Sequence, residues 1–390
     1  MESSRAWRRP TLGAVAARAG VSAATVSNAL NGTGRLSDTT RQHVLATARE
    51  LGYAPASAAR ALARGASGVL GLTMTTYGDL PVPYIVIPYY AELTLSAMAA
   101  AHQRGYLLLT MPSSTSPWMW LNTPMDGVIH VAPRADDPVR SILQERGLPL
   151  VSEGRPPRPE RSDAWVDSDH ETGLRLLLDH LTESGARRIG LSLPRHDDEY
   201  PNLIGREYRS WCDEHRMPAL VEEYDPLPDY FTAERDAVSR LLDRDPRPDA
   251  AIGVYSDSGH NLLAAARHRG LQVPRDLLVA CISEDPDYAT TTPPVTTISL
   301  RPDRVGAEAV DLLIALINAR GGVDRHRLVQ PLLIPRRSTR RPLPSRNSRL
   351  DAPAVSPNDA RGPVRAISNR TASSGPRSSR PPEVALPPPG

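Results

Sequence analysis

The stretch covering residues 11–64 constrains the fold most, because it reads as short helices separated by turn residues. The first helix is expected over Leu12 to Ala19 and ends at Gly20. The second is expected over Ala23 to Leu30, with Ser22 as its N-cap. Two short helices joined by a tight turn form a helix-turn-helix unit, whose second helix is narrow enough to lie in a DNA major groove.

A third helix is predicted over Asp38 to Leu51, between an N-cap at Ser37 and a stop at Gly52. Its apolar stripe consists of Val44, Leu45, Ala48 and Leu51. Three helices of this size can bury one small core. Residues 1–54 are therefore expected to form a helix-turn-helix DNA-binding domain.

The stretch contains, in this order, the runs VAARAGVSAATVSNALNG, TRQHVLATARELGY and AARALAR. This order resembles the DNA-binding headpiece and hinge of the LacI/GalR family of bacterial transcription regulators. The resemblance implies that the start of the second helix reaches base edges. The expected DNA-contacting residues of the headpiece are Thr11, Ser22, Ala23, Ala24, Thr25, Ser27 and Asn28.

Among these residues, Asn28 has the side chain best suited to a donor and acceptor pair on a base, most naturally adenine. Ala23 and Ala24 can offer only apolar contact with thymine methyl groups. Ser22, Thr25 and Ser27 are placed where phosphate contacts or capping occur. The alternative is that Asn28 only caps or solvates its helix.

Residues 55–68 are predicted to form a hinge. Residues 57–64 favour a helix, but a helix of about two turns is marginal in water. The resemblance implies that it folds when two copies pair on DNA, with Leu62 as an apolar wedge in the minor groove. Arg60 and Arg64 would lie along the backbone, with Ala63 between them. The alternative is that Leu62 packs on the headpiece.

Composition limits the remaining possibilities. The chain has 390 residues, of which 40% are hydrophobic, so it can hold two or three domains. It shows no membrane-spanning apolar run and no leader, and we expect a cytoplasmic protein. Cys212 and Cys281 are far apart and lack metal-ligand spacing, so no disulfide or zinc site is expected. No Gly-rich loop that could cradle a phosphate appears, and no cofactor is expected. The first 68 residues hold nine arginines against three acids, which fits a protein that meets polyanions at one end.

From Val69 onward, apolar runs alternate with helical stretches, which predicts an α/β body of parallel sheets covered on both faces. Strands are expected at residues 69–74, 106–110, 127–131, 148–151, 165–167, 188–192, 250–254 and 278–281. Helices are expected at residues 89–104, 138–146, 171–184, 206–215, 232–243, 259–269 and 303–320.

The runs HLTESGARRIGLSLP, RPDAAIGVYSD and RGLQVPRDLLVACI resemble the effector-binding region of the same family. The resemblance implies a two-lobed, periplasmic-binding-protein-like body over residues 69–339, with two doubly wound parallel sheets, a ligand between them and a role in dimerisation. The chain would cross between the lobes near Ser168, Thr297 and Gln330. Residues 340–390, rich in Pro, Ser and Arg, are expected to be a disordered tail.

Ligands of open α/β sheets bind at the carboxyl ends of the strands. The resemblance and this rule together give the candidate effector-binding residues Tyr89, Tyr90, Arg206, Asp257, Ser283 and Glu284. Arg206 is expected to bind ligand hydroxyls or carboxylates, with a surface ion pair as the alternative. The two tyrosines are otherwise core, and Asp257 is otherwise a helix cap.

Some positions depart from the family pattern. Ser283 stands where the family has an aspartate that binds sugar-like hydroxyls, and Glu284 restores an acid only with a shift of one residue. Residues 111–125 are shorter and richer in Pro and Ser than expected. Aromatic residues that could stack on a sugar ring are Trp118, Trp120, Trp165, Tyr200, Tyr230 and Phe231.

The sequence thus predicts a dimeric repressor that binds a palindromic operator and responds to a small, sugar-like effector. One alternative is a DNA-binding regulator with a vestigial cleft. A solute-binding receptor shares the body but predicts an export signal and no headpiece. We expect no enzyme, since Asp257, Ser258 and His260 at one helix start cannot align as a catalytic triad.

Overall fold

The computed structural model describes residues 10–31, 33–53, 66–74, 87–134, 137–195, 199–226, 232–319 and 321–341. The predicted hinge residues Arg60, Leu62, Ala63 and Arg64 lie outside the described residues, as does the tail from residue 342 onward. Within these ranges, no helix combines the length and the apolarity that crossing a bilayer requires.

Three helices form the amino-terminal bundle, namely α1 (Leu12–Ala19), α2 (Ala23–Asn31) and α3 (Asp38–Glu50). Their predicted bounds are confirmed to within one residue. Gly20, with φ of 65°, ends α1. Within the predicted apolar stripe of α3, Leu45 is only half-buried. Thr47, outside that stripe, is buried, and its hydroxyl is satisfied by donating to the carbonyl of His43 (2.9 Å). The buried core consists of Val15, Ala16, Ala19, Val26, Ala29, Val44 and Ala48.

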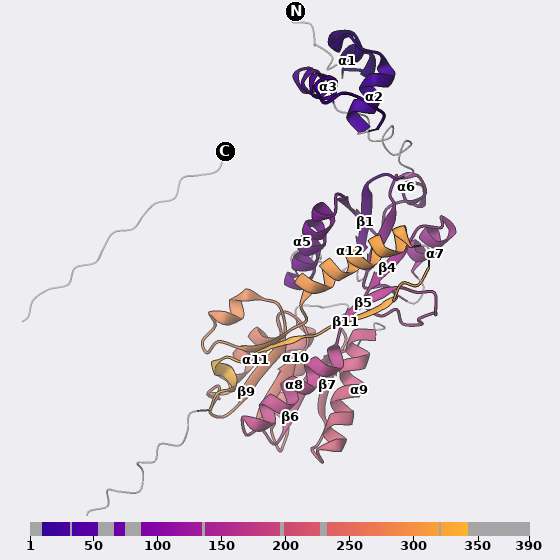
Figure 1. Cartoon of the computed structure of the whole chain (residues 1–390). Coiled ribbons are helices and arrows are strands. Elements are labelled where there is room, and N and C mark those ends of the chain that lie inside the picture. Colours follow the sequence, from indigo (N-terminus) through magenta and orange to yellow (C-terminus); the bar gives the residue numbers. More distant parts are fainter. Residues whose placement is uncertain are drawn as a thin grey trace, which may run out of the picture. The chain divides into compact units, whose positions relative to one another are not determined.

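The first large sheet has the strand order β11-β5-β4-β3-β1-β2, and all of its neighbours are parallel (Figure 1). Its strands are β1 (Val69–Met74), β2 (Leu107–Pro112), β3 (Gly127–Val131), β4 (Leu150–Glu153), β5 (Trp165–Ser168) and β11 (His326–Val329). Alternate residues of β3 pack on opposite layers, as parallel strands buried on both faces do. One layer is α5 (Pro88–Gln103) with α12 (Pro302–Asn318), and the other is α6 (Pro117–Asn122) with α7 (Pro138–Glu145).

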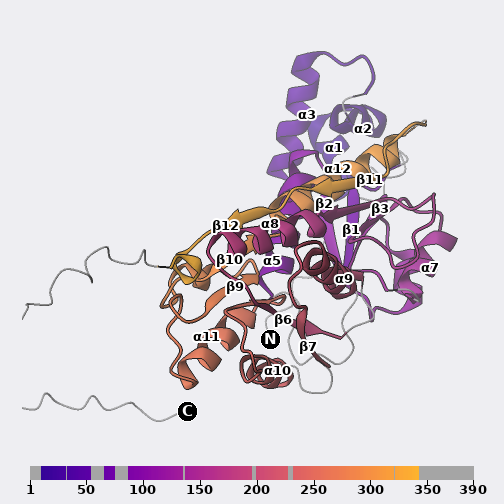
Figure 2. The ribbon, with the colours of Figure 1, turned by 90° about the horizontal axis from the view of Figure 1, so that it is seen from below.

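The second sheet has the order β12-β10-β9-β8-β6-β7, with β12 antiparallel to β10 and the other pairs parallel (Figure 2). Its strands are β6 (Ile189–Pro194), β7 (Leu220–Tyr224), β8 (Ala250–Gly253), β9 (Leu278–Ile282), β10 (Thr296–Ser299) and β12 (Leu332–Ile334). One face carries α8 (His170–Glu183) and α9 (Glu199–Glu214), and the other carries α10 (Ala233–Leu242) and α11 (Ser258–His268).

The chain passes between the two sheets three times, as predicted. It leaves the first sheet after Ser168, returns after Leu300, and leaves again at Gln330 between β11 and β12. The second passage lies three residues beyond the predicted Thr297, since β10 continues to Ser299. The three passages lie near one another, since the Ser168 hydroxyl donates to the Leu300 carbonyl and the Gln330 side-chain amide donates to Asp169 (3.2 Å).

Several elements differ from the sequence prediction. Helix α9 begins at Glu199 and not at Arg206, because Pro201 lies in its first turn, where proline is tolerated. The prediction missed β7, β10, β11, β12 and α6. Strands β7 and β11 are partly exposed and carry charged residues, and β10 is threonine-rich, so none presents a continuous apolar run.

Candidate DNA-binding helix and ligand cavity

Helix α2 has one face on the bundle core and one face open. Val26 and Ala29 are buried, whereas Ala23 and Ala24 at its start are exposed. Ser22 caps the helix, since its hydroxyl accepts from the Thr25 backbone N–H (3.1 Å). The exposed start of α2 can therefore approach another surface without disturbing the core.

The other predicted DNA-contacting residues also have local roles. The Thr11 hydroxyl accepts from the Ala14 N–H (3.2 Å) and caps α1. Asn28 is half-buried, and its side-chain oxygen accepts from the Thr33 hydroxyl (3.3 Å). Its carbonyl accepts from the Thr33 N–H (3.0 Å), so Asn28 helps to end α2.

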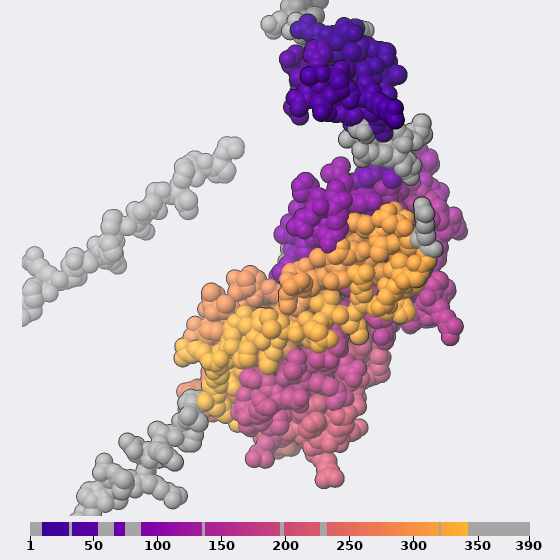
Figure 3. Space-filling model, in the orientation of Figure 1, coloured from indigo at the N-terminus to yellow at the C-terminus, as the bar shows by residue number. Residues whose placement is uncertain are grey.

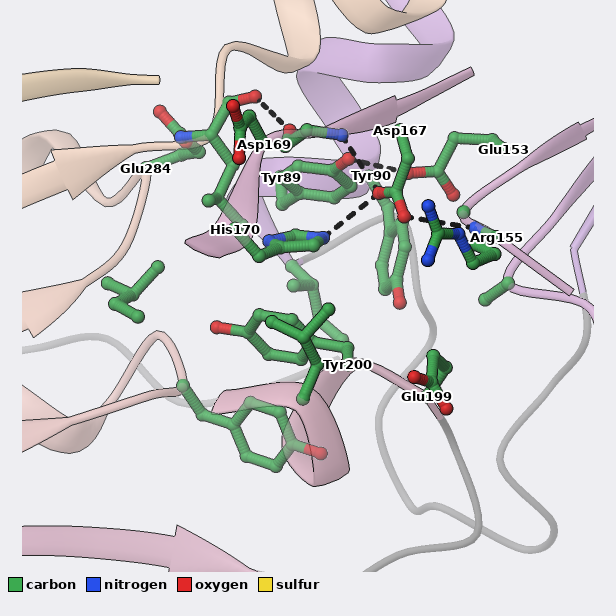
Figure 4. Close-up of a pocket in the computed structure, with 18 of the residues that line it drawn as sticks. Tyr89, Tyr90, Glu153, Arg155, Asp167, Asp169, His170, Glu199, Tyr200 and Glu284 are labelled. Atoms are coloured by element: carbon green, nitrogen blue, oxygen red, sulfur yellow. Dashed lines mark hydrogen bonds and ion pairs between the residues drawn. The ribbon is translucent and has the colours of Figure 1, made fainter. Parts of the chain in front are cut away.

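A cavity of about 250 Å³ lies between the two large sheets, where the chain passes from one to the other (Figure 4). Its polar lining comes from the carboxyl ends of strands, with Glu153 ending β4, Asp167 near the end of β5, and Ser283 directly after β9. This is the edge at which open α/β sheets bind ligands. Both sheets thus contribute side chains to one cavity.

Tyrosines form the aromatic part of the lining. Tyr89 and Tyr90 begin α5 and meet edge to face, with 5.3 Å between ring centroids. Across the cavity, the Tyr200 ring lies 4.8 Å from that of His170 and 6.5 Å from that of Tyr255. The Tyr200 hydroxyl donates to the Val254 carbonyl (3.0 Å), which holds the ring in place. Such rings can stack on the apolar face of a sugar or on a heterocycle.

Glu153 is the most deeply placed carboxylate of the cavity, with 5% of its surface exposed. The Tyr89 hydroxyl donates to it (2.5 Å), as Figure 4 shows. Burial raises the pKa of Glu153 to about 7, although the bond from Tyr89 acts in the opposite direction. Burial and the neighbouring Glu153 carboxylate together hold the pKa of Tyr89 well above its usual value.

His170 and Asp167 form a second buried pair, with 2.9 Å between His170 Nε2 and Asp167 Oδ1. Burial alone would lower the pKa of His170, but the carboxylates of Asp167, Glu153 and Asp169 together outweigh burial, and the pKa is raised. The other ring nitrogen, Nδ1, is buried without a hydrogen-bond partner. Asp167 also accepts from the backbone N–H groups of Ser168 and Arg155 (2.8 and 3.0 Å).

Glu284 supplies a carboxylate from the second sheet. The Leu300 N–H donates to it (2.6 Å), and burial raises its pKa to about 7. Ser283 is buried at 8% exposure, and its hydroxyl accepts from the Asp285 N–H (3.1 Å). Glu284, the acid one residue after the position where the family has an aspartate, therefore lines the cavity.

Four of the six predicted effector-binding residues line this cavity, namely Tyr89, Tyr90, Ser283 and Glu284. Arg206 does not; its side chain is 59% exposed and pairs with Glu199 (2.7 Å), because α9 begins two turns before it. Asp257 lines a different cavity, next to α11, and makes no capping bond there. Arg206 therefore forms a surface ion pair outside this cavity, and its role toward a ligand stays a prediction.

Among the aromatic residues singled out from the sequence, Tyr200 lines the cavity. Both Trp118 and Trp120 belong to α6; Trp120 is buried, and Trp118 is 70% exposed. Trp165 is buried against His326, with 4.9 Å between ring centroids. Tyr230 and Phe231 lie outside the described residues.

Sequence reasoning missed Glu153, Asp167 and His170. Each lies at the end of a short strand or directly after it, in the runs LVSE and WVDSDH. The rule that ligands bind at strand carboxyl ends would have selected them had it been applied to every strand. This rule does not predict which of the side chains at strand ends lie close together across the two sheets.

Comparisons with known proteins agree with this architecture. Residues 11–56 match the family described as "Bacterial regulatory proteins, lacI family", and residues 178–339 match the "Periplasmic binding protein-like domain". The HTH-type transcriptional regulator CelR of Thermobifida fusca is 31% identical over 318 residues, covering 79% of this chain and 92% of CelR. The HTH-type transcriptional repressor CytR of Escherichia coli K12 is 28% identical over 360 residues, covering 87% of this chain and 99% of CytR.

Solved structures show the same likeness. A CelR–cellobiose complex has a TM-score of 0.63 at 28% identity, covering 85% of this chain and 100% of that chain. The Lac repressor dimer bound to operator and the anti-inducer ONPF has a TM-score of 0.73 at 21% identity, covering 85% of this chain and 99% of that chain, and supports the fold alone. Because the similarity to CelR extends over most of both proteins, this chain belongs to the LacI family of bacterial DNA-binding transcriptional regulators.

Proposed function

We propose that this protein is a repressor that binds a palindromic operator as a homodimer, reads it with α2, and releases or holds it according to a small molecule in the cavity between the sheets. The observation that carries the ligand response is the position of the cavity. Residues of both sheets line it, and the Ser168 hydroxyl donates to the Leu300 carbonyl where two chain passages meet beside it. A ligand that contacts both sheets favours one arrangement of them over another, and operator affinity follows that population.

An exposed apolar surface on the first sheet's domain supports dimerisation. Leu95 and Met98 on α5 are 60% and 51% exposed, Leu107 on the edge strand β2 is 68% exposed, and Trp118 on α6 is 70% exposed. Leu107 lies on the edge strand of the sheet, next to α5, where a second copy of the chain could cover it together with the exposed side chains of α5. A second copy of the chain is the partner that a palindromic operator requires.

The experiment that tests the function is selection of bound duplexes from a random pool by the full-length protein. We expect a consensus of two inverted half-sites about one helical turn apart. Selected sequences without inverted symmetry would contradict the dimer, and no preference over scrambled duplex would contradict the function.

Asn28→Ala should relax the preference at one base pair of each half-site by about 1 to 3 kcal/mol, because it removes a side chain that can bond a base edge with both a donor and an acceptor. The measurement is anisotropy of labelled operator variants. Thr33→Val is the matched control, since it removes the hydroxyl that donates to Asn28 but keeps the amide. If Asn28→Ala leaves base preference unchanged, its role is that of a cap.

The hinge remains a proposal from the family resemblance. The apolar side chain of Leu62 would enter the minor groove of the operator, with Arg60 and Arg64 along the phosphates and Ala63 close to the DNA. Such a wedge adds to specific binding and not to the electrostatic attraction that any duplex exerts.

For the ligand, a structure of the relative CelR is a complex with cellobiose. We infer that the cavity here also takes a small hydroxylated molecule, because it joins stacking tyrosines with carboxylates that accept hydrogen bonds. Tyr200→Ala should weaken ligand binding about tenfold or more, while operator affinity without ligand stays unchanged. Titration calorimetry with the ligand selected from a saccharide and nucleoside panel measures this.

Arg206→Ala is the comparison variant. With its side chain exposed and paired to Glu199, we expect only a small change in ligand affinity. Loss of the response in Arg206→Ala would instead support the direct ligand contact that the resemblance implies. Operator affinity that no compound of the panel alters would favour the alternative of a vestigial cleft.

A further inference from the structure

The cavity between the sheets has an unusual charge balance for a site that takes a neutral ligand. One arginine, Arg155, and one histidine, His170, are its basic lining residues. Its acidic lining residues are Glu153, Asp167, Asp169, Glu171, Glu199 and Glu284. A concave site with such a balance focuses a negative potential, which repels anions and attracts cations.

Three of these acids pair with a basic side chain, and the fourth, Asp169, lies at the N-terminus of α8, where the helix dipole favours a negative charge. Asp167 accepts from His170 and from two backbone N–H groups, and Asp169 caps α8 through Thr172 (3.1 Å to its N–H). Glu171 pairs with Arg175 (3.8 Å) and Glu199 with Arg206 (2.7 Å). Their charge is satisfied by the protein itself, so they require nothing from a ligand.

Glu153 and Glu284 differ from the other four. Neutral donors bond to them, the Tyr89 hydroxyl to Glu153 and the Leu300 N–H to Glu284. In the part of the chain that the structure describes, neither forms an ion pair with an arginine. His170 acts on Glu153 and Arg301 acts on Glu284 through space, without a direct ion pair. A buried carboxylate that lacks a direct ion pair is costly in its charged form. These two carboxylates, one from each sheet, therefore await a cation or keep a proton.

A second observation points to a ligand in the same place. The His170 side chain is 10% exposed, and its Nδ1 is buried without a hydrogen-bond partner. Figure 4 shows the ring between Asp167 and Tyr200, within the lining of the cavity. A small rotation of the His170 ring would let a polar group of a bound molecule form a hydrogen bond with Nδ1.

On this basis, and resting on the proposed ligand response, we propose that the ligand is a hydroxylated molecule bearing a protonated amine, such as an amino sugar, whose ammonium group pairs with Glu153 or Glu284. An ammonium ion restores the charge balance that the protein leaves open. Tyrosine faces such as those of Tyr90 and Tyr200 add attraction for a cation and cover the apolar side of a sugar ring. A neutral sugar would leave both carboxylates without a direct ion pair.

The proposal carries a proton balance that can be measured. Since the pKa values of Glu153 and Glu284 are each raised to about 7, a share of each carboxyl group holds a proton near neutral pH. Pairing with an ammonium group favours the carboxylate, so the carboxyl proton goes to the buffer. At about pH 6, where the free amine already carries its proton, binding of the amine should release protons, and binding of its neutral analogue should not.

The test compares amines with isosteric neutral analogues by titration calorimetry of the full-length protein, in buffers of different ionisation enthalpy. The probes are glucosamine against glucose, galactosamine against galactose, and the β-1,4 glucosamine disaccharide against cellobiose and N,N′-diacetylchitobiose. We expect at least one amine to bind about tenfold more tightly than its neutral analogue, with proton release. Glu153→Gln or Glu284→Gln should reduce this ratio to about one.

Glu207→Gln is the control. It removes one negative charge, as the other two variants do, but from α9 and outside the cavity lining, so the ratio of amine affinity to neutral-analogue affinity should stay unchanged. If no amine exceeds its neutral analogue, or if both glutamine variants keep the preference, the inference is overturned. A neutral sugar that binds and alters operator affinity would overturn it while supporting the proposed function. If no probe binds, the inference fails, and operator selection still tests the DNA-binding function separately.

Discussion

Glu153→Gln should make the protein more stable above about pH 7, by up to about 3 kcal/mol, while leaving its stability below about pH 4.5 nearly unchanged. The folded protein holds the Glu153 proton more tightly than the unfolded chain does, since burial raises its pKa from 4.5 to about 7. The stability linked to this proton is fully present below pH 4.5 and is lost as the pH rises through 7. Glutamine has no proton to lose and can still accept the bond from Tyr89.

Urea unfolding of the two proteins at about pH 4.5, 6 and 8, followed by tryptophan fluorescence, gives this difference. Around Glu153 the facing ionisable groups are Tyr89, Asp167 and His170, and they are common to both proteins. Glu214→Gln is a control of opposite sign, because Arg175 holds the pKa of Glu214 at about 2, so its loss should lower stability at neutral pH. A Glu153→Gln variant that is less stable than the parent at pH 8 would mean that the carboxylate charge stabilises the fold.

Gly306→Ala should destabilise the first large domain by about 2 to 3 kcal/mol, although alanine is normally the better helix residue by about 1 kcal/mol. Gly306 lies in α12 where α12 packs on α5, and the surfaces of the two helices meet in Figure 3. A Cβ at this position would lie 2.5 Å from the Leu93 carbonyl oxygen and 3.1 Å from the Ala97 nitrogen. Because these are backbone atoms, a change of rotamer cannot relieve the overlap.

Thermal unfolding followed by calorimetry checks this prediction. Gly13→Ala in α1 is the control, since its nearest neighbouring atom would be Thr11 Oγ1 at 3.7 Å, and we expect no loss of stability. Adding Ser96→Ala to Gly306→Ala should restore only part of the loss, because the Leu93 carbonyl remains in place. A rise in unfolding temperature for Gly306→Ala would show that the two helices can separate at little cost.

The ligand cavity shows the limit of reading the chain position by position. Tyr89 and Tyr90 could be selected because they begin a helix that follows a strand, and Glu284 because it follows one. Arg206 was selected by resemblance, but α9 begins seven residues earlier than expected, and that turns its side chain toward Glu199 and solvent. The start of this helix therefore places the Arg206 side chain outside the lining of the cavity.

Local signals along the chain determined the three-helix bundle and the alternation of strands and helices. Caps such as Ser22 and Ser37 and stops such as Gly20 act on their immediate neighbours, so they can be read without coordinates. The tertiary structure alone decided that Glu153 and Glu284, 131 positions apart, line one cavity with no arginine paired to either among the described residues. Burial and charge balance depend on which strand ends face each other across two sheets, and no local pattern records that pairing.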